Sequence, residues 1–312
     1  MDNHIRYWRR RRGLSQAELG RRLGVGKATV SKLERGALRL RDTMIARLVE
    51  ALEVPAGELL GDYAEPAETT HFGARTVAVG EKAGLVREVF DRVAGRYDLM
   101  NDLMSLGIHR LWKDALVDWL RPRPGMRVLD LAGGTGDIAL RIAERTRGEA
   151  RVVVCDANPA MLAIGRDRAI DRGHLGDIAW LAGDAERLPL AEQCVDAVTI
   201  AFGIRNVTRI ERALAEARRV LVPGGRFLCL EFSHIAVAGL DRLYEAYAER
   251  VLPALGAAVA GDRAAYEYLV ESIRRFPDQA RFAAMIAAAG LGEVRVRNLS
   301  GGIAALHSAW RL

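Results

Sequence analysis

Acidic side chains follow three short apolar runs in the middle of the chain, and their positions predict a site for a ligand that carries a ribose. The first run ends in Asp130, and Asp156 and Asp184 follow the next two. Runs of this length are typical of buried strands in a parallel sheet, and the carboxyl ends of such strands meet at one edge. Asp156 lies about twenty residues beyond a glycine-rich turn, where a carboxylate in this topology binds ribose hydroxyls.

The glycine-rich turn, Gly133-Gly134-Thr135-Gly136, lies between Asp130 and Asp137. Gly134 and Gly136 let a ligand lie against the backbone, and the helix expected after the turn offers unpaired N–H groups. Dinucleotide enzymes use a similar turn, but several acids at the strand ends would repel a pyrophosphate and suit a sulfonium cation. The predicted cofactor is therefore S-adenosylmethionine rather than NAD. The alternative is a turn that only packs a helix on the sheet.

The elements that must position these acids alternate between strand-like and helical segments. Helical spacing resumes after Gly136, near Pro159 and after Val207. This alternation is typical of a doubly wound α/β sheet, in which ligands bind at the carboxyl ends of the strands. The expected strands cover residues 127–130, 151–156, 178–182, 195–202, 227–232, 293–298 and 303–310.

The first sixty residues have a different pattern, that of a compact set of short helices. Ser15 is an expected N-cap, and Glu18 three positions later completes a capping box. This helix ends near Leu23, a glycine turn follows, and a second helix covers residues 27–34. Two helices joined in this way indicate a helix-turn-helix, whose second helix enters the DNA major groove.

The segment Leu14-Ser15-Gln16-x-Glu18-Leu19, followed by Val30-Ser31-x-Leu33-Glu34-Arg35-Gly36, resembles the phage-repressor-like (Cro/CI-type, or XRE) DNA-binding domains over residues 5–60. The resemblance implies phosphate contacts from Gln16 and from the arginines at 9–12. It also implies that four residues of the second helix face base edges: Lys27, Ala28, Thr29 and Lys32. The alternative is a helical bundle that binds protein instead of DNA. A single copy binds DNA weakly unless the chain dimerises, so a homodimer is part of the DNA-binding hypothesis.

The charge is unevenly distributed along the 312 residues. Residues 1–62 contain thirteen Lys/Arg and eight Asp/Glu, which accounts for +5 of the net charge of +6. The two parts of the chain are therefore expected to meet different partners, with DNA at the basic one.

The other composition signals argue against a disulfide-bonded, metal-binding, membrane-spanning or secreted protein. Cys155, Cys194 and Cys229 are far apart and are expected to be reduced, and the six histidines lack metal-ligand spacing, so we expect no structural metal. No apolar run reaches the eighteen or so residues that cross a bilayer, and the arginine-rich N-terminus lacks the apolar region of a secretory signal. We expect a cytoplasmic protein.

Several segments in the second part of the chain together resemble the ubiquinone/menaquinone biosynthesis C-methyltransferases (the UbiE/MenG family) over about residues 84–312. They are the segment from Tyr97 to Lys113, the segment Asp130 to Asp137, Phe202-Gly203-Ile204-Arg205-Asn206-Val207, Leu230-Glu231-Phe232-Ser233, Tyr268 to Gln279, and Gly301 to Trp310. The resemblance implies a class I S-adenosylmethionine-dependent methyltransferase that acts on a polyprenyl benzoquinol or a demethylmenaquinol. It places cofactor contacts on Thr135, Asp156, Asp184 and Ala185.

The expected domains are a helix-turn-helix domain at 1–62, a linker at 63–83 and a methyltransferase domain at 84–312. Pro66, paired threonines and small residues indicate the linker. Residues 84–124 are expected to form helices that cover the ligand end of the sheet, or else an amphipathic cap that only packs on it.

Methylation of a ring carbon needs a group that removes a proton from the ring hydroxyl or stabilises the phenolate. The candidates are Tyr97, His109, Arg205, Asn206 and His307. Arginine stays protonated and favours stabilisation, whereas histidine is the natural proton acceptor near neutral pH. Asn206 would orient the ring, or cap the helix that follows.

The polyprenyl tail of the family's substrate requires an apolar opening. Residues 235–260 are apolar and rich in small residues, so they would form either this opening, with peripheral contact to a bilayer, or a buried helix. Two further functions stay open from the sequence. One is a transcription regulator that uses the methyltransferase fold to sense S-adenosylmethionine or quinol, and the other is methylation of a different aromatic substrate.

Overall fold

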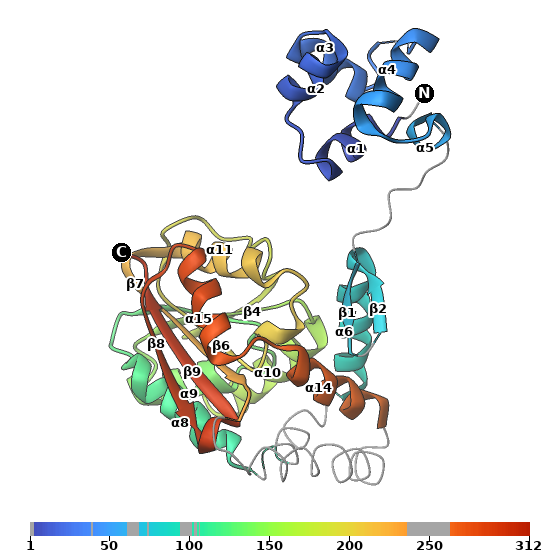
Figure 1. Cartoon of the computed structure of the whole chain (residues 1–312). Helices are drawn as coiled ribbons and strands as arrows, with labels where there is room; N and C mark the ends of the chain where they lie inside the picture. Colours follow the sequence, from blue (N-terminus) through green and yellow to red (C-terminus); the bar gives the residue numbers. More distant parts are fainter. Residues whose placement is uncertain are drawn as a thin grey trace. The chain divides into compact units, whose positions relative to one another are not determined.

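The computed structural model divides the chain into two compact units, residues 1–68 and 69–312. It describes residues 3–38, 40–60, 69–73, 75–93, 102, 105, 107–235 and 263–312. Figure 1 labels the helices and strands along the chain. Each unit is described by itself.

The N-terminal unit is helical, with its side chains packed around one core. Its described part contains α1 (Ile5–Arg11), α2 (Gln16–Leu23), α3 (Lys27–Glu34), α4 (Asp42–Leu52) and α5 (Ala56–Leu60). The Ser15 hydroxyl accepts from the Glu18 backbone N–H, and the Glu18 carboxylate accepts from the Ser15 N–H, which confirms the predicted capping box. Ile5, Leu19 and Leu48 are fully buried between the helices. The predicted bounds of α2 and α3 are confirmed as well.

Two short strands and a helix begin the second unit, where the sequence pattern indicates a linker. β1 (Thr69–Phe72) pairs antiparallel with β2 (Arg75–Ala78), and α6 (Val79–Val93) follows directly. The linker expected at 63–83 therefore overlaps a hairpin and a first helical turn. Strands of four residues are too short to give a clear alternation, and only Val77 in β2 is buried, which explains why the pattern was missed.

A seven-stranded sheet forms the centre of this unit, in the order β5-β4-β3-β6-β7-β9-β8. Its strands are β3 (Arg127–Leu131), β4 (Arg151–Asp156), β5 (Ile178–Ala182), β6 (Val195–Ala201), β7 (Leu221–Phe232), β8 (Gly292–Leu299) and β9 (Ala304–Trp310). The strands from β5 to β7 are parallel, and β9 pairs antiparallel with β7 on one side and with β8 on the other, so β9 runs against the other strands of this sheet. Strand β7 begins six residues before the predicted strand at 227, because the segment from Leu221 pairs with Val195 of β6.

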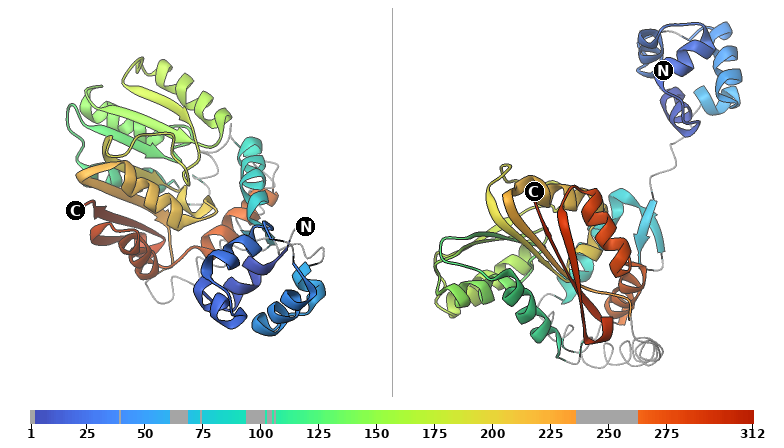
Figure 2. Two further views of the ribbon diagram at one scale, coloured as in Figure 1. Left: turned by 90° about the horizontal axis from the view of Figure 1, so that it is seen from above. Right: turned by 60° about the vertical axis from the view of Figure 1, so that its left-hand side comes forward.

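Helices cover both faces of this sheet, as Figure 2 shows. One face packs against α8 (His109–Leu120), α9 (Asp137–Thr146) and α10 (Pro159–Asp171), and the other against α11 (Ile210–Val220) and α15 (Gln279–Ala288). The alternation within strands sets this division, since Val128 belongs to the first core and its neighbour Leu129 to the second. A short helix, η2 (Ile204–Asn206), follows β6, and α14 (Arg263–Arg275) precedes α15. Another short helix, η5 (Ser300–Gly302), joins β8 to β9.

None of the helices in the described ranges has the length and apolar character needed to span a membrane.

Candidate active site

A cavity of about 420 Å³ lies at the carboxyl ends of the parallel strands. Its walls come from the segments that follow β3, β4, β5 and β6, and from the inner side of α6. Among the lining residues are Val86, Phe90, Gly134, Asp156, Ala185 and Asn206. The edge at which the sequence predicts a ligand is therefore hollow.

The glycine-rich turn forms one wall of this cavity with its backbone. Gly134 has a φ of 55°, and a Cβ there would approach the Met161 methyl group to 3.1 Å. Gly136, at a φ of 72°, lies against Trp180, whose ring would be 2.4 Å from an added Cβ. The left-handed backbone favours glycine at both positions, and at Gly136 the Trp180 ring leaves no space for a side chain either. Gly136 therefore packs the turn on Trp180 of β5, and Gly134 faces the cavity.

Asp156 lies at the end of β4 and joins the cavity wall to the turn. One carboxylate oxygen accepts from the Gly134 N–H at 2.9 Å, and the other from the Asn158 N–H at 2.8 Å. Burial raises the pKa of Asp156, although these backbone hydrogen bonds oppose the shift. Asp184 and Ala185 line the same cavity after β5. These three predicted cofactor residues and Gly134 are thus brought together.

Asp130 lies beneath the turn instead of in the cavity wall. Its side chain is buried, and one oxygen accepts from the Thr199 hydroxyl at 2.9 Å. The other oxygen has no partner among the described residues. Burial raises the pKa of Asp130 to about 7. Thr135 is buried as well, and its hydroxyl accepts from Arg168 of α10 at 3.3 Å. Both residues therefore support the turn in this structure.

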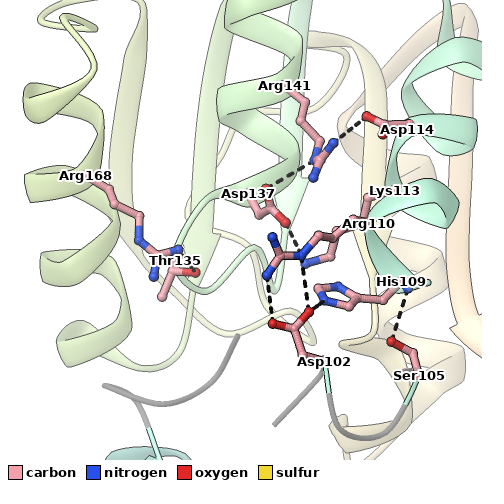
Figure 3. Close-up of polar contacts among 10 residues, drawn as sticks. All are labelled: Asp102, Ser105, His109, Arg110, Lys113, Asp114, Thr135, Asp137, Arg141 and Arg168. Atoms are coloured by element: carbon pink, nitrogen blue, oxygen red, sulfur yellow. Dashed lines mark hydrogen bonds and ion pairs between the residues drawn. The ribbon is translucent and has the colours of Figure 1, made fainter. Parts of the chain in front are cut away.

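A network of ion pairs connects α8 to the first turn of α9, as Figure 3 shows. The buried Lys113 ammonium lies 2.6 Å from an Asp137 oxygen, and Arg141 binds both Asp137 and Asp114. These cations lower the pKa of Asp137 against the opposing effect of burial. The network fixes the helix that begins at the glycine-rich turn. Sequence reasoning noticed Asp137 but missed its partner Lys113.

The two histidine candidates are both buried, and neither lines the cavity. His109 begins α8 and bonds through Nε2 to Asp102 at 2.8 Å (Figure 3). His307 lies within β9, and its Nε2 bonds the Gln279 carbonyl at 3.1 Å. Burial lowers the pKa of both rings. Tyr97, the third candidate for accepting the proton, lies outside the described residues. Most of the apolar segment expected at 235–260 lies outside them as well.

Arg205 and Asn206 lie in η2, directly after the cavity-lining Phe202 and Gly203. The Arg205 guanidinium is buried, 2.6 Å from a Glu231 carboxylate oxygen, and its Nε and Nη2 have no acceptor among the described residues. Asn206 lines the cavity and accepts a hydrogen bond from the Tyr268 hydroxyl at 2.9 Å. Burial raises the pKa of Tyr268 to about 12, so this hydroxyl stays protonated.

The partners of this pair, Glu231 and Tyr268, were not predicted as site residues. Glu231 is the acid within the otherwise apolar end of β7, where a buried charge requires a partner, and this was the available signal. Tyr268 reaches Asn206 from a helix 62 residues later in the chain, which no local pattern reveals.

In the N-terminal unit, Lys27, Ala28 and Lys32 are exposed on α3, and Thr29 is half-buried. Gln16 donates to a Glu34 oxygen at 2.8 Å, and this carboxylate also binds Arg9. The expectation that Arg9 lies near phosphates is therefore wrong in this structure, because Arg9 is buried and joins α1 to α3. The side chains of Arg10 and Arg11 are exposed.

The sheet order, the glycine-rich turn and the acid after β4 define the class I S-adenosylmethionine-dependent methyltransferase fold. A methyltransferase of Thermotoga maritima shares this fold with a TM-score of 0.53 at 21% identity, covering 73% of this chain and 100% of that one. A methyltransferase solved with the Haloferax volcanii activator Trm112 has a TM-score of 0.53 at 17% identity, covering 71% of this chain and 97% of that one.

The chain belongs to the ubiE/COQ5 methyltransferase family, whose model matches residues 76–311, and a helix-turn-helix model matches residues 5–59. It is 60% identical to the ubiquinone/menaquinone biosynthesis C-methyltransferase UbiE of Paracoccus denitrificans, over 80% of this chain and 98% of that protein. The namesake of Methylobacterium nodulans is 61% identical over 78% of this chain and 97% of that protein. The chain is an S-adenosylmethionine-dependent C-methyltransferase with an N-terminal helix-turn-helix domain, as the sequence predicts.

Proposed function

We propose that this enzyme methylates a ring carbon of a polyprenyl benzoquinol or a demethylmenaquinol. The observation that carries the proposal is the match over almost the whole second unit to relatives named for ubiquinone and menaquinone biosynthesis. The cavity at the strand ends supports the proposal, because Asn206, from a segment typical of the family, and Asp156 line the same cavity.

The residues around the cavity fit S-adenosylmethionine. Asp156 would hold the ribose hydroxyls, Asp184 and Ala185 would lie along the base, and Gly134 would let the ligand approach the backbone. The left-handed backbone at Gly134, where an added Cβ would crowd the Met161 methyl group, and the buried carboxylate of Asp156 both suit such a ligand. When bound, the cofactor supplies an electrophilic methyl group on a sulfonium.

Arg205 would stabilise the phenolate form of the substrate from behind the cavity wall, since its own side chain does not line the cavity but follows the lining residues Phe202 and Gly203. Its Nε and Nη2 are buried donors without an acceptor among the described residues, and such donors cost free energy until an oxygen meets them. Glu231 and the Phe202 carbonyl, each 2.6 Å from Nη1, hold the guanidinium in place. A phenolate oxygen would accept hydrogen bonds from these two donors, next to the cation.

Asn206 would orient the substrate ring. Because the Tyr268 hydroxyl occupies the amide oxygen, the amide N–H groups of Asn206 remain to donate to a ring oxygen. The ring of Tyr268 stacks on Phe72 of β1, with centroids 4.4 Å apart, so the early hairpin helps to position this hydroxyl.

Helix α6 would exclude water from the reaction. It contributes Val86 and Phe90 to the cavity wall. It is fastened to the loop after η2 by Lys82, whose buried ammonium donates to the Val207 carbonyl at 3.1 Å. This arrangement supports the expectation that helices from the start of the unit cover the ligand end of the sheet.

The N-terminal unit would bind DNA through α3. The support is its match to the helix-turn-helix model together with the exposed Lys27, Ala28 and Lys32 on that helix. Contact with a membrane surface and a homodimer, both expected from the sequence, stay predictions.

The test is a methylation assay with radiolabelled S-adenosylmethionine that offers a short-chain benzoquinol and a short-chain demethylmenaquinol to the full chain. Label in either quinol is the expected result, and the ratio of the two rates identifies the preferred ring. A chain that binds the cofactor but labels neither quinol would favour the alternative, a regulator that senses S-adenosylmethionine.

A further inference from the structure

A second cavity lies at the opposite edge of the large sheet from the candidate active site. Its volume is about 690 Å³, and it is bordered by the end of α8, the segment before β3 and residues of β6, β7, β8 and β9. Nothing in the proposed methyl transfer uses this cavity, because the active site is built at the carboxyl ends of the parallel strands. Basic and aromatic side chains prevail among its lining residues: Trp119, Arg121, Arg123, Arg226, Arg295 and Trp310.

The charges in this second cavity are not balanced. Asp196 is the acidic residue in its wall, and it is already paired with Arg127, whose guanidinium lies 2.7 Å away. Glu293 reaches Arg295 at 3.9 Å, but both side chains are mostly exposed, so this pair contributes little. The four arginines in the wall therefore leave a net positive charge among the described residues.

Arg226 lies in the wall of the second cavity and is held by several contacts. Its guanidinium packs on two indole rings, 5.5 Å from the centroid of Trp119 and 5.0 Å from that of Trp310. Nε donates to the Ser308 hydroxyl at 3.0 Å, and Nη1 donates to the Trp119 carbonyl in the last turn of α8. Both acceptors are neutral, and Nη2 has no acceptor within the part of the chain that the structure describes. The Nη2 side of this fixed guanidinium can therefore donate hydrogen bonds to a ligand.

This arrangement costs free energy in the absence of an anion. Burial lowers the pKa of Arg226, and the nearby Arg121 and Arg295 lower it further. A partly desolvated cation among like charges destabilises the folded chain, and an anion in the same place would offset that cost. The planar guanidinium is the side chain best suited to phosphate oxygens, because it donates two parallel hydrogen bonds.

We propose that the second cavity binds a phosphate-bearing small molecule through Arg226, Arg121 and Arg295. Nη2 of Arg226 donates to a phosphate oxygen, and the two exposed arginines balance the remaining charge. The cavity volume lies within the range of about 300–1,000 Å³ that holds small molecules. The same chemistry would accept a free phosphate compound or the headgroup of an anionic lipid.

The test is isothermal titration of the full chain with inorganic pyrophosphate at constant ionic strength. We expect saturable binding that weakens about tenfold or more when Arg121→Gln and Arg295→Gln are combined, because charge-assisted hydrogen bonds and charge balance are lost. Methylation should be unchanged in that variant, since both residues lie away from the active-site cavity.

Arg147→Gln is the matched control for Arg121→Gln taken alone. Arg147 follows α9 with a φ of 55°, as Arg121 follows α8 with a φ of 54°, so both changes remove one charge from the same left-handed position. Absence of saturable binding would overturn the proposal. Equal pyrophosphate affinity in the wild type and the double variant would also overturn the proposal. So would an affinity that falls as far in Arg147→Gln, because either result would place the anion elsewhere.

A second arm distinguishes the two sources of phosphate. Vesicles of phosphatidic acid in phosphatidylcholine should retain the chain if the ligand is a lipid headgroup, and the Arg121→Gln, Arg295→Gln variant should lose this retention. If the double variant weakens pyrophosphate binding but the vesicles do not retain even the wild-type chain, the ligand is a free phosphate compound.

Discussion

At the scale of single residues, the buried carboxyl of Asp130 makes stability depend on pH. Burial raises its pKa to about 7 in the folded chain, whereas an unfolded aspartate titrates near about 3.9. The folded chain therefore retains a proton that the unfolded chain has lost. Below about pH 4 both states hold the proton, and Asp130 does not lower the free energy of unfolding. As the pH rises toward about 7, the unfolded chain releases the proton and the folded chain keeps it, so the free energy of unfolding falls.

The Asp130→Asn variant should remove this loss, because asparagine keeps an oxygen for Thr199 and carries no charge. Relative to wild type, its free energy of unfolding should gain on the order of 4 kcal/mol between about pH 4 and about pH 7.5. Urea unfolding across this range measures the gain. The exposed Asp167→Asn serves as the control. A difference between Asp130→Asn and wild type that does not change with pH would refute the assignment.

Tyr268 offers a second prediction, because its hydroxyl orients Asn206 while its ring packs on Phe72. Tyr268→Phe keeps the ring contact and removes the hydrogen bond. We expect kcat to fall about tenfold through loss of substrate orientation, with little change in the affinity for S-adenosylmethionine. Steady-state methylation kinetics and cofactor titration give both quantities. A kcat equal to that of wild type would show that Asn206 needs no such support.

Only part of the site could be predicted from residue types. The acids Asp156 and Asp184 were found because each follows an apolar run at a strand end, which is a local pattern. The same pattern selected Asp130, but its position beneath the turn depends on Thr199, 69 residues later. His109 and His307 were selected by their chemistry alone, and their burial away from the cavity depends on tertiary packing.

At the scale of elements, the capping box at Ser15 is expected to stabilise α2. Ser15→Ala should lower the free energy of unfolding of the N-terminal unit by about 1 kcal/mol, because the Glu18 N–H loses its acceptor. Urea unfolding of residues 1–68, which form a compact unit, measures this effect. Ser15→Asp, which retains an acceptor at the N-cap, should remain close to wild type, and an equal loss in both variants would argue against the cap.

Elements with strong local signals were predicted with accurate bounds, and those with weak signals were not. Helix α2 has a capping box, a glycine turn separates it from α3, and both have regular apolar spacing, so their predicted bounds agree with the structure. The hairpin of β1 and β2 was missed because its strands are short and mostly exposed. The early start of β7 depends on its pairing with β6, so the turn residues Pro223 to Gly225 misled the prediction.

At the scale of the whole molecule, the chain joins a methyltransferase to a basic helical unit, and the two activities should separate. Replacing Lys27 and Lys32 with alanine should weaken binding to a random-sequence DNA duplex. The slope of the logarithm of the binding constant against the logarithm of the salt concentration should become shallower by about 0.9 for each phosphate that the variant no longer neutralises. Methylation should be unaffected. Arg21→Ala on α2 is the control for loss of one exposed charge away from α3, and its side chain is 79% exposed. DNA affinity that is the same in all variants would contradict groove binding by α3.

The account of the catalytic unit depends on Asp156 and the backbone of Gly134 forming one wall of a cofactor site at the strand ends. Isothermal titration of the full chain with S-adenosylmethionine tests it most directly. We expect one saturable site per chain, with affinity reduced about tenfold or more by Asp156→Ala, since hydrogen bonds to a charged acceptor are lost. Absence of saturable heat in the wild type, or equal affinity in Asp156→Ala, would contradict the account.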